Sequence, residues 1–319
     1  MKMDHTLFPE LLTRSACILG EGAVIERLRH KNGLDLDPHI VNSGFVYEEP
    51  KKAAIEAIYR EYLDIGVRHR LPLLLSTPTW RASRERIEAA GRAGQDVNGD
   101  NFRFLDTLRS TYGDYAAQVV ICGLMSCRGD AYNPSEALDV AEAVDFHTWQ
   151  ARMLARADVD FLMASTLPAL SEATGLAQAM AATGTPYIVS FVFRPEGTLL
   201  DGTPLKEAIA AIDADVRPKP LAYMCNCTHV SIFRRAWQHE INFSAFARKR
   251  VIGLLANTAA LTPEELDNSD ATLSEDPETF GRSVAGLHTD FGLKILGGCC
   301  GTDDRHIGHL AQQLAGEAV

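Results

Sequence analysis

The chain has 319 residues, of which 46% are hydrophobic and 23% charged, with a formal net charge of −11. This balance is typical of a globular protein in water, and the acidity argues against a nucleic-acid partner, which requires a basic surface. No apolar run is long enough to span a bilayer, and the first sixteen residues, with Asp4 and Glu10 among them, do not resemble a signal peptide. We therefore expect a cytoplasmic protein with no membrane partner, in which the seven cysteines are reduced.

Short apolar segments recur along the chain, as expected of strands that are buried on both faces. They lie at 16–22, 71–80, 119–125, 159–167, 186–193, 220–227, 250–259 and 293–302. Apolar residues recur with helical spacing between them, at 48–66, 133–157 and 167–184. Thr262 followed by Pro263 predicts a further helix start. Residues 91–118 show no clear pattern, and 195–219 are expected to form an irregular loop.

Eight strand candidates that alternate with helices indicate an α/β protein, a (β/α)8 TIM barrel formed by a single domain over residues 1–319. A doubly wound open sheet is the alternative. Its dinucleotide-binding version loses support because no G-x-G-x-x-G motif follows the first strand. In a barrel the functional residues lie at the C-terminal ends of the strands, so we expect the site there.

Cysteines gather at the ends of two predicted strands. The sixth strand ends in Cys225 and Cys227, which are expected to share one face, and the eighth ends in Cys299 and Cys300 between glycines. Strands six and eight lie two apart around a barrel, so Cys299, Cys300 and one of the other two could supply three thiolates to one ion. Three protein ligands with one open position are typical of catalytic zinc. A redox disulfide between the adjacent Cys299 and Cys300 is disfavoured by ring strain.

Other candidates have simpler interpretations. Cys17, Cys122 and Cys127 are expected to be buried hydrophobic residues. His229 follows the sixth strand and is expected to be packed or solvated, with a role as fourth ligand or substrate contact as the alternative. Asn257 ends the seventh strand and is a candidate polar contact at the barrel mouth.

These residues resemble the homocysteine S-methyltransferase family. GGCCGT at 297–302 is similar to the family's C-terminal signature, and NCT at 226–228 is similar to its upstream Asn-Cys pair. Further resemblances run along most of the chain, at 21–28, 76–83, 189–209 and 256–259.

The resemblance implies a (β/α)8 barrel in which Cys227, Cys299 and Cys300 hold zinc. It implies that two small molecules bind, a thiol acceptor and a methyl donor, and that homocysteine is methylated to methionine. Zinc would lower the pKa of the acceptor thiol and keep it as the attacking thiolate, with no catalytic side chain beyond that. The chain ends at Val319, which favours the short members that use a sulfonium donor, S-methylmethionine or S-adenosylmethionine, over the longer betaine-using members.

The family motifs also imply substrate contacts, which fall here on Glu21, Thr79, Trp80, Ser165 and Asn257. Glu21 stands where the family has an Asp that binds the substrate amino group, and Trp80 could bind an onium donor by a cation–π contact. Ser165 stands where the family has Glu. Because a neutral serine cannot pair with an ammonium group, the alternative function is a barrel that binds zinc and a different thiol or small ligand, without homocysteine turnover.

Overall fold

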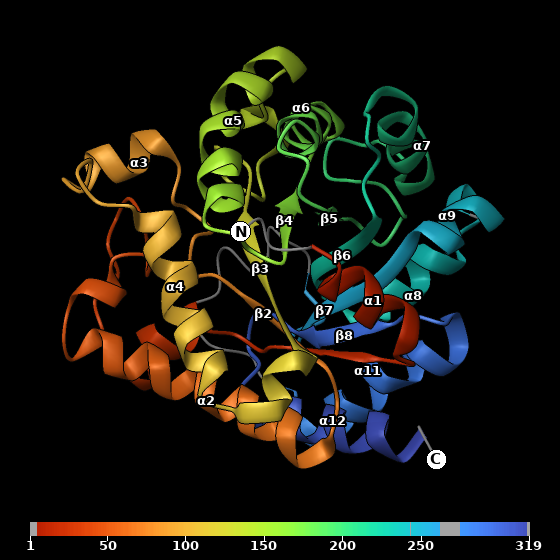
Figure 1. Ribbon diagram of the computed structural model, residues 1–319. Coiled ribbons are helices and arrows are strands. Elements are labelled where there is room, and N and C mark those ends of the chain that lie inside the picture. Colours follow the sequence, from red (N-terminus) through yellow and green to blue (C-terminus); the bar gives the residue numbers. More distant parts are fainter. Residues whose placement is uncertain (1–4, 243, 262–274, 318–319) are drawn as a thin grey trace.

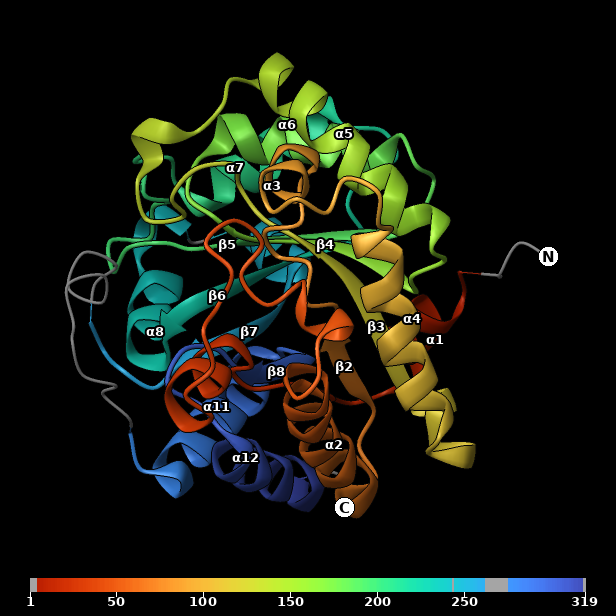
Figure 2. The same cartoon turned by 90° about the vertical axis from the view of Figure 1, so that its left-hand side faces the viewer.

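The computed structural model describes residues 5–242, 244–261 and 275–317. Eight parallel strands form a closed barrel in the order β1 to β8, and β1 pairs with β8. Figures 1 and 2 show helices arranged around the strands. The expected (β/α)8 barrel is confirmed and the open-sheet alternative is wrong.

The strands are β1 (Ile18–Gly20), β2 (Leu73–Ser76), β3 (Val119–Met125), β4 (Phe161–Leu167), β5 (Tyr187–Phe191), β6 (Ala222–His229), β7 (Val251–Asn257) and β8 (Ile295–Gly298). The α-helices are α1 (Leu7–Arg14), α2 (Lys51–His69), α3 (Arg84–Ala89), α4 (Val97–Ser110), α5 (Val140–Arg156), α6 (Leu170–Ala181), α7 (Leu205–Asp215), α8 (Val230–Gln238), α9 (Ala245–Arg250), α11 (Pro277–Phe291) and α12 (Asp304–Glu317). Shorter helical segments are η1 (Arg27–Lys31), η2 (Phe45–Tyr47), η3 (Gly113–Gln118), η4 (Pro134–Glu136) and η5 (Glu240–Asn242).

Apolar side chains fill the inside of the barrel. Helix α1 adds Phe8 and Leu11 to this interior cluster, beside Ile18, Phe161 and Ala222, which are the first residues of their strands. Phe8 stacks on Phe161 with ring centroids 3.8 Å apart. Full burial of one such ring stabilises the fold by about 2 kcal/mol. Helix α1 therefore covers the N-terminal end of the barrel, and the C-terminal end is left for a site.

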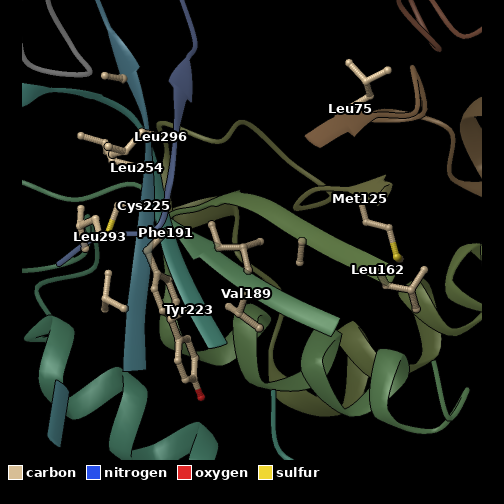
Figure 3. Close-up of a cluster of buried hydrophobic side chains, with 14 of the residues drawn as sticks. Leu75, Met125, Leu162, Val189, Phe191, Tyr223, Cys225, Leu254, Leu293 and Leu296 are labelled. Atoms are coloured by element: carbon tan, nitrogen blue, oxygen red, sulfur yellow. The ribbon is translucent and has the colours of Figure 1, made fainter. Parts of the chain in front are cut away.

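A second and larger cluster lies between the strands and the helices, and Figure 3 shows part of it. Strand β6 illustrates how residues alternate between the two clusters. Ala222 and Met224 belong to the interior cluster, whereas Tyr223 and Cys225 belong to the outer one. Both faces of the strand are thus buried, which explains why the strands appear in the sequence as nearly continuous apolar runs.

The helical patterns in the sequence correspond to α2, α5 and α6, and the helices α4 and α7 lie in segments where no helix was expected. Helix α4 lies within 91–118, and Asp96 caps its N-terminus by accepting a hydrogen bond from the Gly99 N–H. Helix α7 lies within 195–219, so the expectation of an irregular loop there is wrong for its second half. The predicted helix start at Thr262 lies outside the described residues. Within the described ranges, no helix has the length and apolar character needed to cross a membrane.

Strands β4 and β6 end irregularly at the C-terminal end of the barrel. The register of β4 on β5 shifts between Ala164 and Leu167, and that of β6 on β7 shifts between Asn226 and Thr228. Within these shifts Thr166 has φ +58° and Cys227 has φ +51°. Bulges of this kind re-aim the side chains that follow them, and strained backbone of this kind clusters at functional sites.

Candidate metal centre

Three cysteine sulfurs meet at the C-terminal end of the barrel. Cys227 lies near the end of β6, and Cys299 and Cys300 directly follow β8. Their Sγ atoms all lie within 4.8 Å of one another, and those of Cys227 and Cys299 are 2.7 Å apart. In the described part of the chain, this is the one group of three or more His, Cys, Asp or Glu side chains with such spacing. The structure thus brings together the three residues that the family resemblance assigns to one site.

Cys225 does not belong to this group. Its side chain is fully buried in the outer cluster, and Figure 3 shows it near Phe191 and Leu254. Burial raises the pKa of its thiol well above the ordinary value. The expectation that Cys225 and Cys227 share one face is wrong, because the bulge and the left-handed backbone at Cys227 break the alternation.

The side-chain amide of Asn226 fixes the bulged ends of β4 and β6 to each other. Its Oδ1 accepts hydrogen bonds from the Thr166 N–H at 2.9 Å and from the Ser190 hydroxyl at 2.7 Å. Its Nδ2 donates to Thr166 Oγ1 at 2.6 Å and to the Cys227 sulfur at 3.4 Å. Asn226 is buried, so these contacts hold Cys227 in its left-handed conformation and support its sulfur directly.

Backbone contacts and a neighbouring asparagine hold the other two cysteines. The Cys299 N–H donates to the Ala256 carbonyl at 2.7 Å, and the Cys300 N–H donates to Asn257 Oδ1 at 3.1 Å. The Thr302 hydroxyl donates to the Cys299 carbonyl at 2.6 Å. Asn257, expected at the barrel mouth, therefore lies there and positions the backbone of Cys300.

Glycine is required at two positions, one in β8 and one just after Cys300. A Cβ on Gly297 would lie 2.6 Å from the Cα of Gly20 on β1, so only glycine allows these strands to approach. Gly301 has φ +80°, in the left-handed region that favours glycine. The chain can therefore turn immediately after Cys300, which keeps both adjacent cysteines at the end of the barrel.

The three thiols share protons through their mutual contacts. Hydrogen bonds from Cys299 and then Cys300 hold the pKa of Cys227 well below its usual range. The same contacts raise the pKa values of Cys299 and Cys300 well above theirs. Three thiols that already favour one ionised sulfur fit a soft divalent cation, which would replace the shared protons. Cys227, Cys299 and Cys300 would hold such an ion through their sulfur atoms, and the ion would keep a bound thiol in its thiolate form.

The two positions expected to bind an amino group carry little negative charge. Glu21 is 8% exposed, and its Oε2 accepts a hydrogen bond from the Ser76 N–H at 3.1 Å. Burial raises the pKa of Glu21 to about 8 despite that bond, so the carboxyl is mostly protonated at neutral pH. Ser165 is buried, and its hydroxyl lies 3.5 Å from Thr166 Oγ1.

Thr79 and Trp80 already have partners within the protein. The Thr79 hydroxyl lies 2.6 Å from Thr77 Oγ1 and donates to the Leu124 carbonyl at 2.8 Å, so it connects the loop after β2 to β3. The ring of Trp80 is stacked by the guanidinium of Arg81, 4.2 Å from the ring centroid. One face of the tryptophan therefore carries a cation from this chain.

His229 caps helix α8. Its Nδ1 accepts a hydrogen bond from the Ser231 N–H at 3.1 Å, and its Nε2 lies 3.6 Å from Glu275 Oε2. It is not part of the cysteine group. A packed histidine is what the sequence favours, and the capping contact gives that packing a specific role.

Two residues at this site were missed in the sequence. Tyr132, in the loop after β3, has a pKa raised well above its ordinary value, first by the charge of Cys227 and then by burial, because its hydroxyl lies beside the thiols. Glu26 accepts a hydrogen bond from the Gly301 N–H through Oε2 at 2.5 Å. Neither residue ends a strand, and only the folded loops bring them to the cysteines.

Comparison with known proteins gives consistent matches. A family model described as Homocysteine S-methyltransferase matches residues 18–314. The homocysteine S-methyltransferase of Escherichia coli (strain K12) is 24% identical over 318 residues, which cover 94% of this chain and 96% of that protein. Betaine–homocysteine S-methyltransferase 1 of Bos taurus is 22% identical over 321 residues, covering 97% of this chain and 74% of that protein. Among solved structures, the homocysteine methyltransferase MmuM from Escherichia coli in its metallated form matches with a TM-score of 0.73 and 20% identity, over 96% of this chain and 99% of that chain.

Proposed function

Because the chain belongs to the homocysteine S-methyltransferase family and is therefore an S-methyltransferase, we propose that it uses zinc to methylate homocysteine. The donor is a sulfonium compound, S-methylmethionine or S-adenosylmethionine. The acceptor thiolate forms a bond to the methyl carbon, the carbon–sulfur bond of the donor breaks, and the donor leaves as a neutral thioether. The observation that carries the proposal is the group of three cysteine sulfurs within 4.8 Å at the barrel mouth.

The residues of this chain hold the reacting sulfur in place. Cys227, Cys299 and Cys300 bind the metal, which when bound lowers the pKa of the acceptor thiol and keeps it as a thiolate. Asn226 supports the Cys227 sulfur, and Asn257 fixes the backbone that carries Cys300. These contacts restrict the sulfur positions before the substrate arrives, and alignment is the main requirement of a direct methyl transfer.

Glu21, Trp80 and Ser165 are the remaining expected substrate contacts. Glu21 holds a proton at neutral pH, and an arriving ammonium group would favour its carboxylate form because opposite charges lower a carboxyl pKa. Trp80, the expected donor contact, carries the guanidinium of Arg81 stacked on its ring. Ser165 lacks charge, which is the observation that favours the second candidate, a barrel that binds zinc and another thiol without methylating homocysteine.

The test is to measure zinc content and methyl transfer together. Purified protein should hold about one zinc per chain and form methionine from homocysteine with one sulfonium donor, and betaine serves as the alternative donor in the same assay. Cys299→Ala should lose both zinc and activity. A wild-type protein that binds zinc yet methylates no thiol with any donor would establish the second candidate. Full activity of Cys299→Ala would refute activation by the metal.

A further inference from the structure

We infer that Glu26 supplies the carboxylate that pairs with the amino group of the acceptor, in place of the strand-four carboxylate that Ser165 lacks. This inference rests on the proposed function and deepens it by assigning the acceptor to the amino thiols. Three observations support it. Glu26 lies beside the cysteines, one of its carboxylate oxygens has no described partner, and neither Ser165 nor Glu21 offers a negative charge at neutral pH.

Glu26 lies next to the cysteine turn. It follows β1 and precedes the short helix η1, and β1 pairs with β8, which leads into Cys299 and Cys300. Its Oε2 accepts the Gly301 N–H at 2.5 Å, one residue beyond Cys300. The pKa of Cys299 is raised first by its hydrogen bond to Cys227 and in smaller part by the charge of Glu26. The carboxylate is therefore within electrostatic range of the sulfur cluster.

The negative charge of Glu26 is not neutralised by a neighbour. No described residue forms a hydrogen bond or ion pair with its Oε1, and the side chain is only partly buried. The adjacent cation, Arg27, is directed elsewhere. Its Nη2 binds Glu61 and lies 3.1 Å from Asp304, and its guanidinium stacks on Tyr62. One oxygen of Glu26 thus fixes the cysteine turn, and the other has no partner among the described residues.

Neither Ser165 nor Glu21 presents a negative charge to an ammonium group at neutral pH. Ser165 is neutral and buried, and Glu21 keeps its proton while its Oε2 accepts the Ser76 N–H. An ammonium group bound beside a metal cation needs at least one ionised partner, because a buried unpaired charge is unfavourable. Glu26 is the carboxylate that hydrogen-bonds the turn of the cysteines in the described structure, whereas Asp303 is paired with Arg305 and His306.

Glu26→Gln separates the charge from the structural contact, because the amide oxygen of Gln can still accept the Gly301 N–H. The substrates are homocysteine and 4-mercaptobutanoate, its analogue without the amino group. We expect the KM for homocysteine to rise about tenfold, while the KM for 4-mercaptobutanoate changes by less than about twofold. Zinc content should not change. Glu10→Gln removes the same charge from α1, at the opposite end of the barrel, and should affect neither substrate.

Thiol binding and its rescue by a second substitution test the role of Glu26. Calorimetric binding of the two thiols to the zinc-loaded protein, without donor, should show the same loss of selectivity in Glu26→Gln, and adding Ser165→Glu to that variant should restore it. Equal weakening of both thiols, or loss of zinc from Glu26→Gln, would show that Glu26 only holds the turn. A wild-type protein that binds both thiols equally would also overturn the inference. If no donor methylates either thiol, the proposed function fails, and the binding selectivity still decides the role of Glu26.

Discussion

Replacing Asn226 with alanine tests how the metal centre is held. The substitution leaves the buried Thr166 N–H and the Ser190 hydroxyl without their acceptor. Each unsatisfied buried donor costs about 1–3 kcal/mol, so we expect the free energy of unfolding of the metal-free protein to fall by about 2–6 kcal/mol. The Cys227 sulfur also loses its N–H partner at 3.4 Å. Loss of such a supporting contact typically lowers metal affinity by about 10–100-fold.

Urea unfolding of the metal-free protein measures the first effect, and competition with a chromogenic chelator at a temperature where both proteins are folded measures the second. Asn242→Ala is the matched control. Asn242 is equally buried and its side chain makes three hydrogen bonds to backbone groups, of Gly197, Lys206 and Ala236, away from the cysteines. The Asn242→Ala variant should have a lower free energy of unfolding and an unchanged affinity for zinc. The reasoning is refuted if Asn226→Ala binds zinc as tightly as the wild type, or if Asn242→Ala weakens zinc to the same extent. Asn226→Asp keeps an acceptor for both donors and removes the N–H groups that Asn226 donates to Thr166 Oγ1 and to the Cys227 sulfur.

Three other predictions concern the thiols and Glu21. Cys299→Ala should reduce bound zinc from about one per chain to almost none, whereas Cys225→Ala should keep the metal and lose only stability, as metal analysis would show. After zinc removal by a chelator, hydrogen peroxide should join Cys227 to Cys299, whose sulfurs are 2.7 Å apart, and peptide mass spectrometry should find two hydrogens lost; a bond between Cys299 and Cys300 would contradict this. The pKa of Glu21 rises from 4.5 to about 8 on folding, so its contribution to stability is fully present below pH 4.5 and is lost as the pH rises toward 8. Between pH 5 and 8 the metal-free wild type should lose up to about 1.4 kcal/mol per pH unit from this group, and Glu21→Gln should lack that slope in urea unfolding; equal slopes would count against the buried proton.

Much of the fold is predictable because its strands are buried on both faces. That burial produces the eight apolar runs, which correspond to β1 to β8 with small differences at their ends. Helix α7 was missed although its buried residues Leu205, Ala208, Ile209 and Ile212 follow helical spacing, because the glycines and prolines just before them are typical of a loop. Helix α1 was missed because its role is tertiary: it fills the N-terminal end of a barrel that exists only after folding.

The site is predictable where it depends on strand order. Strand order brings Cys299, Cys300 and the cysteines at the end of β6 together, because these two strand ends lie two apart around the barrel. The choice between Cys225 and Cys227 does not follow from alternation, because a cysteine with positive φ has no local sequence signature. The position of Glu26 depends on where the loop after β1 folds, and β1 reaches β8 only when the barrel closes.

The packed interior of the barrel has a kinetic consequence. With Phe8 and Leu11 filling one end and apolar residues along the whole axis, both reactants have to enter and leave through the same opening. On the proposed function, a thiol bound at the cysteine sulfurs would be covered by a donor that binds over it through the same opening. We therefore expect an ordered sequence of binding, in which the acceptor enters first and the methylated product departs last.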